Sequence, residues 1–241
     1  MIPNEDEILI RDMARQFSQE RLKPFAADWD REHRFPAEAI AEMGLLGFMG
    51  MLVPQQWGGA ETGHLAYAMA LEEVAAGDGA CSTIMSVHNS VGCMPILKYG
   101  SEEQKQRFLR PLAEGSMLGA FALTEPQAGS DASDLRTRAR RDGDHYLLSG
   151  AKQFITNAGT DISACVTITA VTGEQNGKRE ISNLIVPNGT PGYEHGEPYR
   201  KMGWNASDTR PLAFEDCRVP AENLLGGRGE GFKQFMQILD G

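Results

Sequence analysis

Long hydrophobic runs are absent from this 241-residue sequence, and basic residues are fewer than acidic ones. No apolar stretch approaches the roughly 20 residues that a membrane-spanning helix needs. The first residues, MIPNEDEILIRDM, lack the basic start and apolar core of a secretory signal. The 33 acidic and 23 basic residues give a net charge of −10, which argues against a general affinity for nucleic acid or anionic membranes. We therefore expect a cytoplasmic protein. The net negative charge does not exclude a local basic site that binds a phosphorylated ligand.

Cysteine and histidine are too few and too scattered to indicate a metal site. The sequence has no C-x-x-C spacing and no H-E-x-x-H pairing, and four cysteines in a chain of this size do not make a disulfide framework. We expect buried, reduced thiols and no bound metal. The residues concerned are Cys81, Cys93, Cys165, Cys217, His33, His64, His88, His145 and His195.

The first half of the chain has the apolar spacing of helices. Leu9, Met13 and Phe17 recur every four residues, as along one face of a helix. Ser101 followed by Gln104 has the pattern of a capping box, which marks the start of another helix. We predict an N-terminal helical bundle over residues 1–118.

From about Gly119 the pattern changes to short β-branched runs separated by turn residues. Asp142 and Gly143 stand between two such runs, which is a strong hairpin signal. Residues 173–180, GEQNGKRE, are polar enough to form an exposed hairpin loop. We predict an antiparallel β-barrel over residues 119–225, although a sandwich would give the same pattern.

A helical period returns after residue 225, with apolar side chains at i, i+3, i+4 and i+7. Such a stripe needs a partner surface. We predict that residues 226–241 begin a C-terminal helical domain, most of which is missing. The fold class is therefore α+β and multidomain. The stripe consists of Phe232, Phe235, Met236 and Leu239.

The stretch FALTEPQAGSD, residues 121–131, changes from a strand into a polar loop. Loops at strand ends often carry function, and backbone amides beside a serine hydroxyl suit a phosphate. The alternative is a simple turn in which Ser130 and Asp131 cap their own backbone. Glu125 is the obvious candidate for a catalytic acid or base. The glycines of GGRGEG, residues 226–231, are not surrounded by a βαβ unit. They therefore do not indicate a dinucleotide-binding motif, which requires one.

Six segments together resemble the acyl-CoA dehydrogenase family, in the right order along nearly the whole chain. The resemblance implies an N-terminal helical domain, a middle β-barrel and a C-terminal four-helix domain. It therefore agrees with the order helix, strand, helix that the spacing predicts. The segments are VPQQWGGA, GSEEQKQRFLRPLAEG, FALTEPQAGSDASDL, GDHYLLSGAKQFITNAG, KMGWNASDTRPLAFEDCRVP and LLGGRGEGF.

The reaction that this resemblance implies is α,β-dehydrogenation of an acyl-CoA thioester with FAD as the hydride acceptor. Leu123 and Thr124 would lie against the isoalloxazine edge, and Ser130 near the flavin phosphates. The second flavin contact would be Phe154, Ile155 and Thr156, where many members have tryptophan in place of Phe154. The whole implied flavin-binding segment is Phe121, Ala122, Leu123, Thr124, Glu125, Pro126, Gln127, Ala128, Gly129 and Ser130.

The resemblance also implies the acyl-CoA contacts, which are Ser130, Phe232, Asp240 and Gly241. The catalytic glutamate of the family belongs to the C-terminal domain, beyond Gly241, so no residue of this chain is assigned as the base. Glu125 is then expected to be a structural hydrogen-bond or ion-pair partner rather than the base.

The stretches GACSTIMSVHNSVG and GWN look most like members that act on short or short branched acyl chains. Such enzymes serve fatty acid or branched-chain amino acid catabolism. Where many members have arginine, this sequence has Asn205. Partners implied are an electron-transfer flavoprotein and further copies of the chain in a homotetramer. The alternatives are an acyl-CoA oxidase-like flavoprotein and a non-catalytic fragment that only binds flavin or CoA.

Overall fold

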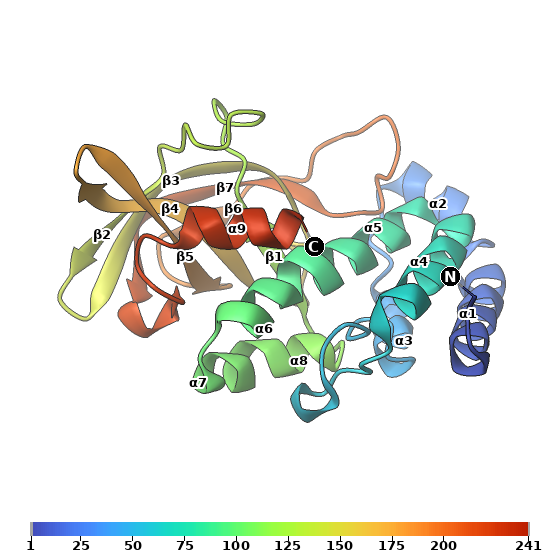
Figure 1. Cartoon of the computed structure of the whole chain (residues 1–241). Helices are drawn as coiled ribbons and strands as arrows, with labels where there is room; N and C mark the ends of the chain where they lie inside the picture. Colours follow the sequence, from blue (N-terminus) through green and yellow to red (C-terminus); the bar gives the residue numbers. More distant parts are fainter. Residues whose placement is uncertain (1, 241) are drawn as a thin grey trace.

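The computed structural model describes residues 2–240, apart from the side chain of Gln175. Helices occupy the first half of the chain and strands the second, and the last helix, α9, crosses in front of the strands (Figure 1). The α-helices are α1 (Glu5–Phe17), α2 (Ala26–Glu32), α3 (Ala37–Leu45), α4 (Gly63–Gly77), α5 (Gly79–Val87), α6 (Met94–Tyr99), α7 (Glu102–Gln104), α8 (Arg110–Ala113) and α9 (Gly231–Leu239). None of the described helices has the length and apolar character to cross a bilayer.

Local sequence signals explain where several helices begin. Asn4 accepts a hydrogen bond from the Glu7 amide and starts α1, and the predicted capping box of Ser101 and Gln104 is confirmed at the start of α7. Helices α5 and α6 form one continuous rod, because a π-helical turn, His88–Cys93, joins them. The buried face predicted for α1 is wrong at two of its three positions, since Leu9 and Met13 are exposed, whereas Phe17 is buried together with Ala14.

The strands are β1 (Leu118–Ala122), β2 (Arg138–Asp142), β3 (His145–Thr156), β4 (Ser163–Gln175), β5 (Lys178–Pro187), β6 (Tyr193–His195), β7 (Thr209–Pro220) and β8 (Leu224–Leu225). They form one sheet in the order β6-β7-β3-β2-β4-β5-β8, with β1 paired to β4. Most pairs are antiparallel, but β1 and β2 pair with β4 in parallel. The described pairings leave β6 and β8 as ends, so the sheet is curved but not closed as the predicted barrel would be.

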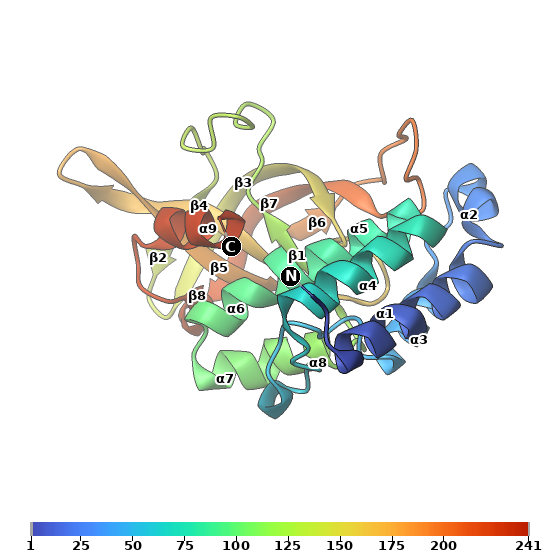
Figure 2. The same cartoon turned by 45° about the vertical axis from the view of Figure 1, so that its right-hand side comes forward.

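Two hairpin predictions have different outcomes. Asp142 pairs with His145 across the β2–β3 turn, as predicted, and Gly143 has a φ of 60°. The loop predicted over residues 173–180 is much shorter, because β4 and β5 continue to Gln175 and Lys178. Asn176 and Gly177 alone make the turn, both with positive φ, as a two-residue hairpin requires. Its polar residues therefore lie on a hairpin that projects from the molecule, far from α1 in both views (Figures 1 and 2).

Separate apolar clusters fill the helical half and the sheet, and a third lies where they meet. The four cysteines are buried and reduced, as predicted. Fully buried His88 joins the two halves: its Nδ1 accepts from the Gly119 amide at 3.1 Å, and its Nε2 lies 3.0 Å from the Leu112 carbonyl. Because Nδ1 is an acceptor, Nε2 carries the proton, and burial lowers the pKa of this neutral imidazole to about 4.

Candidate active site

Residues 121–130 leave the end of β1 and run along the edge of β3. The Gln153 amide donates to the Thr124 carbonyl at 2.9 Å, which fixes the loop to β3. Glu125 and Ala128 exchange two backbone hydrogen bonds in a tight turn. Side chains therefore differ sharply in exposure along the segment. Buried are Ala122, Glu125 and Ala128; half-buried are Phe121, Leu123 and Thr124; exposed are Pro126, Gln127, Gly129 and Ser130.

A fully buried lysine, Lys152, fixes the loop of residues 121–130 through hydrogen bonds. Lys152 Nζ donates to the Glu125 carboxylate at 2.9 Å, to the Leu123 carbonyl at 2.9 Å and to the Thr169 carbonyl at 2.7 Å. An ammonium group has three donor hydrogens, so every one of them is used. The lysine thus ties the loop after β1 to the centre of β4.

The Glu125 carboxylate is saturated by hydrogen bonds as well. It accepts from Lys152, from the backbone amides of Arg136 and Thr137, and from the Gln127 side chain. Burial alone would raise the pKa of Glu125, but the hydrogen bond and charge of Lys152 and the amides outweigh it and bring the pKa to about 2. Glu125 is therefore an ion-pair partner, as predicted, and is unsuited to act as a base near neutral pH.

Beside this loop, β3 presents an aromatic ring to solvent. The pairing of β3 with β7 shifts register between Lys152 and Ile155, and Phe154 takes a φ of 61°. This bulge turns the Phe154 ring outward, 59% exposed, where it packs on Tyr199 with ring centroids 5.1 Å apart. Ile155 is buried beneath, and Thr156 is half-buried. Bulges commonly re-aim a side chain next to a functional site.

Hydroxyl groups of three residues at this place have no partner within residues 2–240. Thr124, Ser130 and Thr156 make no side-chain hydrogen bond there, although each is at least partly exposed. A cavity of about 540 Å³ begins at Asp131, the residue after Ser130, and is bounded by this loop, the β4–β5 hairpin and the start of α9. Phe232 lines this cavity, and its ring makes an edge-to-face contact with Phe235, with ring centroids 5.2 Å apart.

Two protein-family models match the chain. They are the acyl-CoA dehydrogenase N-terminal domain over residues 4–116 and the acyl-CoA dehydrogenase middle domain over residues 120–217. The chain belongs to the acyl-CoA dehydrogenase family. The family predicted from the six segments is thereby confirmed.

Three relatives of this acyl-CoA dehydrogenase chain illustrate the similarity. The mitochondrial short-chain specific acyl-CoA dehydrogenase of Rattus norvegicus is 45% identical over 236 residues, which cover 98% of this chain and 57% of that protein. Butyryl-CoA dehydrogenase from Megasphaera elsdenii has a TM-score of 0.93 at 38% identity, covering 100% of this chain and 63% of that one. A structure described as the electron transferring flavoprotein of Acidaminococcus fermentans has a TM-score of 0.95 at 42% identity, with coverages of 100% and 63%. This chain thus spans 57% to 63% of these relatives.

The residues predicted as acyl-CoA contacts do not all lie together in this family member. Ser130 is exposed at the turn that leads to the 540 Å³ cavity, and Phe232 lines that cavity. Asp240 follows the far end of α9 and is exposed, a helix length from Phe232. Gly241 is outside the described residues.

Lys152 and Tyr199 were missed as residues of this site. Alternation along β3 places Lys152 on the same inward side as Tyr146 and Leu148, which are both buried. A lysine at an inward position of an alternating strand is therefore a signal for a buried ion pair. Tyr199 lies in an irregular loop, where no sequence spacing indicates its neighbour.

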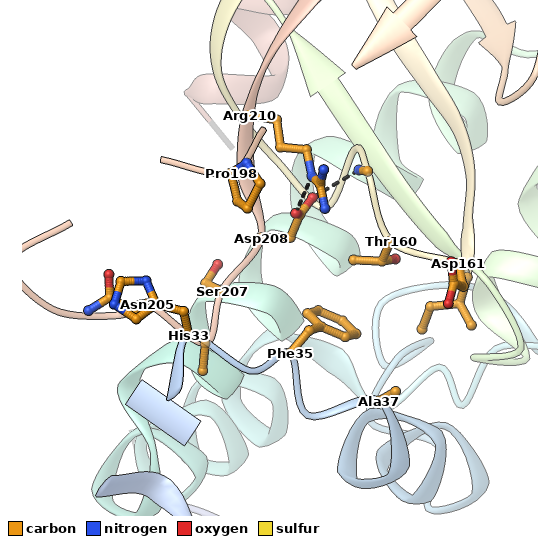
Figure 3. A pocket seen from close by; sticks show the side chains of 13 residues that line it. His33, Phe35, Ala37, Thr160, Asp161, Pro198, Asn205, Ser207, Asp208 and Arg210 are labelled. Atoms are coloured by element: carbon orange, nitrogen blue, oxygen red, sulfur yellow. Dashed lines mark hydrogen bonds and ion pairs between the residues drawn. The ribbon is translucent and has the colours of Figure 1, made fainter. Parts of the chain in front are cut away.

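Another cavity, of about 290 Å³, lies between the helical half and the sheet, at the β3–β4 connection (Figure 3). Asp208 joins its walls, accepting from Arg210 at 2.6 Å and from the Gly159 amide at 2.8 Å. Nearby, Asp30 accepts from the backbone of Asn205 at 2.7 Å. None of the predicted site residues lines this cavity. Of these contacts, the hydrogen bond between Asp30 and Asn205 joins the helical half to the sheet half.

Proposed function

We propose that the protein is an FAD-dependent acyl-CoA dehydrogenase, which oxidises the α,β-bond of a short acyl-CoA and passes electrons to an electron-transfer flavoprotein. One observation carries the proposal: Lys152 and Glu125 hold the Leu123–Thr124 backbone rigidly beside the outward Phe154 ring. Buried polar networks that are fully bonded give such rigidity.

The groups at this place fit a flavin. The exposed Phe154 ring offers a face for a planar ring system. Thr124 and Thr156 offer hydroxyls to its polar edge, and Ser130 with the Gly129 backbone offers donors to a phosphate. When bound, FAD would accept the β-hydrogen as hydride. We propose Phe121 to Ser130 and Phe154 to Thr156 as the flavin-binding residues.

The residues of this chain would bind and orient the substrate. The 540 Å³ cavity, which runs from Asp131, beside Ser130 in the chain, to Phe232, would hold part of the CoA moiety. A fixed geometry lowers the entropic part of the barrier. The base is proposed to lie beyond Gly241, because Glu125 is occupied by Lys152 and Asp131 by Ser133, whose hydroxyl hydrogen bond lowers the pKa of Asp131. Asp240 and Gly241 remain proposed substrate contacts.

The substrate class proposed is a short acyl chain, straight or branched. Two of the relatives are described as short-chain specific and as a butyryl-CoA dehydrogenase. For the chain itself we propose domains at residues 1–118, 119–225 and 226–241. We also propose assembly into a homotetramer, which would cover the apolar side chains that α9 leaves exposed, namely Phe232, Met236 and Leu239.

The test is turnover by the complete gene product with butyryl-, isobutyryl- and octanoyl-CoA, with an electron-transfer flavoprotein or oxygen as the acceptor. We expect preference for one of the two four-carbon substrates and slow reaction with oxygen. A clear preference for octanoyl-CoA would refute the substrate class. Rapid reoxidation of the flavin by oxygen without the partner would instead support the oxidase.

A further inference from the structure

A cavity lined by arginine adjoins the proposed CoA cavity, although the whole chain carries a net charge of −10. It has a volume of about 590 Å³ and lies between β2 and the β4–β5 hairpin. Glu174 is the one carboxylate in its described lining, and the arginines there are Arg136, Arg138, Arg140 and Arg179. Such a local excess of positive charge attracts anions.

The backbone aims three of these arginines in one direction. Arg136, Arg138 and Arg140 are exposed, whereas Thr137 and Ala139 between them are buried. Successive side chains of an extended chain point to opposite sides, so the three guanidinium groups form a row. The backbone that carries the row is fixed, because the Thr137 carbonyl accepts from the Val171 amide at 2.9 Å and β2 pairs with β3 from Arg138 onward.

The four arginines that line this cavity differ in how far nearby carboxylates already neutralise their charge. Arg136 and Arg179 lie 3.8 Å and 3.6 Å from the Asp134 carboxylate, and Arg179 also donates to the Leu135 carbonyl at 3.0 Å. Within residues 2–240, neither Arg138 nor Arg140 has a carboxylate within 4.0 Å. These two guanidinium groups are therefore available to an incoming anion. Their forked donors match a phosphate.

The arginine-lined cavity continues the proposed substrate cavity, since Arg179 lines both. Coenzyme A ends, at the far side from its thioester, in an adenosine that carries a pyrophosphate and a 3′-phosphate. We propose that Arg138 and Arg140, supported by Arg136 and Arg179, bind this 3′-phosphate-bearing end of the acyl-CoA. The inference rests on the proposed function. Binding at an end remote from the reacting bond serves to orient the thioester.

The row of arginines also protects the edge of a strand. β2 pairs with β4 at a single position, Arg138 with Val171, and charged residues on an open edge hinder pairing with other chains. A test must therefore separate phosphate binding from edge protection. Replacement of both arginines by glutamate keeps a charged edge while it reverses the charge that a phosphate meets.

The experiment measures equilibrium binding of CoA and of 3′-dephospho-CoA by calorimetry, on the protein as its gene encodes it. The wild-type protein should bind CoA about tenfold more tightly, since one charge-assisted contact is worth about that factor. The R138E/R140E variant should lose this preference and keep its affinity for 3′-dephospho-CoA within about twofold. The control is Arg218→Glu, on β7 and outside the cavity, which should keep the preference.

Two results would overturn the inference and leave the proposed function intact. One is equal affinity of the wild-type protein for the two ligands. The other is an unchanged preference in R138E/R140E, or in the single variant Arg138→Gln if the double variant does not fold. Failure of the wild-type protein to bind either ligand would overturn the proposed function together with the inference.

Discussion

Replacement of Lys152 by methionine should strongly destabilise the protein and loosen the loop after β1. Methionine fills a similar volume but donates no hydrogen bond, so the Leu123 and Thr169 carbonyls lose their donor. Glu125, which is 3% exposed, would remain as a buried charge without a cation. Removal of one partner from a buried ion pair costs about 3–5 kcal/mol. We therefore expect a loss of about 4 kcal/mol in the free energy of unfolding.

The pH dependence gives a second, independent measure of this pair. The pKa of Glu125 is about 2 in the folded chain against an ordinary value of 4.5, which corresponds to about 3 kcal/mol of stability near neutral pH. Because the folded pKa is the lower one, this stability is present above pH 4.5 and is lost as the pH falls toward 2. In Lys152→Met the pKa of Glu125 rises, so the difference from the wild-type protein should shrink between pH 5 and pH 3.

The assay is urea unfolding followed by circular dichroism, for Lys152→Met, Glu125→Gln and the double variant. Glutamine keeps an oxygen for the amides of Arg136 and Thr137 and removes the charge, so the double variant should recover about 2 kcal/mol relative to additivity. Lys178→Met, at an exposed position of β5, is the control and should change stability by less than about 0.5 kcal/mol. A loss below about 1 kcal/mol for Lys152→Met, or additive single effects, would refute the reasoning.

The remaining predictions concern the proposed flavin surface and α9. Phe154→Ala should weaken FAD binding about tenfold, measured by flavin fluorescence, because the aromatic face is lost. The melting temperature of the FAD-free protein should fall only slightly, because the ring is 59% exposed and loses mainly its contact with Tyr199. Equal FAD affinity of the variant and the wild-type protein would show that Phe154 does not contact the flavin. Gly231→Ala should destabilise the protein by about 1–3 kcal/mol, measured by urea unfolding, since a Cβ there would lie 2.6 Å from the Ser182 backbone. A neutral result would show that α9 can shift on β5.

Local patterns predicted the elements well where a single side chain decides them. The Ser101–Gln104 box starts α7, and Asp142–Gly143 turns β2 into β3. Local patterns predicted the structure less well where contacts between distant segments decide it. The polar residues 173–180 suggested a long loop, but most of them are paired as the ends of β4 and β5. Polar residues are compatible with strands there, because this hairpin projects from the molecule. The predicted buried face of α1, Leu9, Met13 and Phe17, was wrong for a related reason. Which face of α1 is buried depends on where α4 packs.

The sequence by itself determined the order of helices and strands and the family, because these depend on spacing and on residues adjacent in the chain. It also predicted the segments that we propose as the site. The tertiary structure alone decided which residues become partners in space. The family resemblance predicted that Glu125 is a hydrogen-bond or ion-pair partner, but only the structure identifies Lys152, 27 residues away, as the cation that it pairs with. Likewise Arg179 meets the arginine row of β2 only because β4 and β5 fold back beside it. Burial and charge pairing are properties of neighbours in space, and the sheet is what brings these neighbours together.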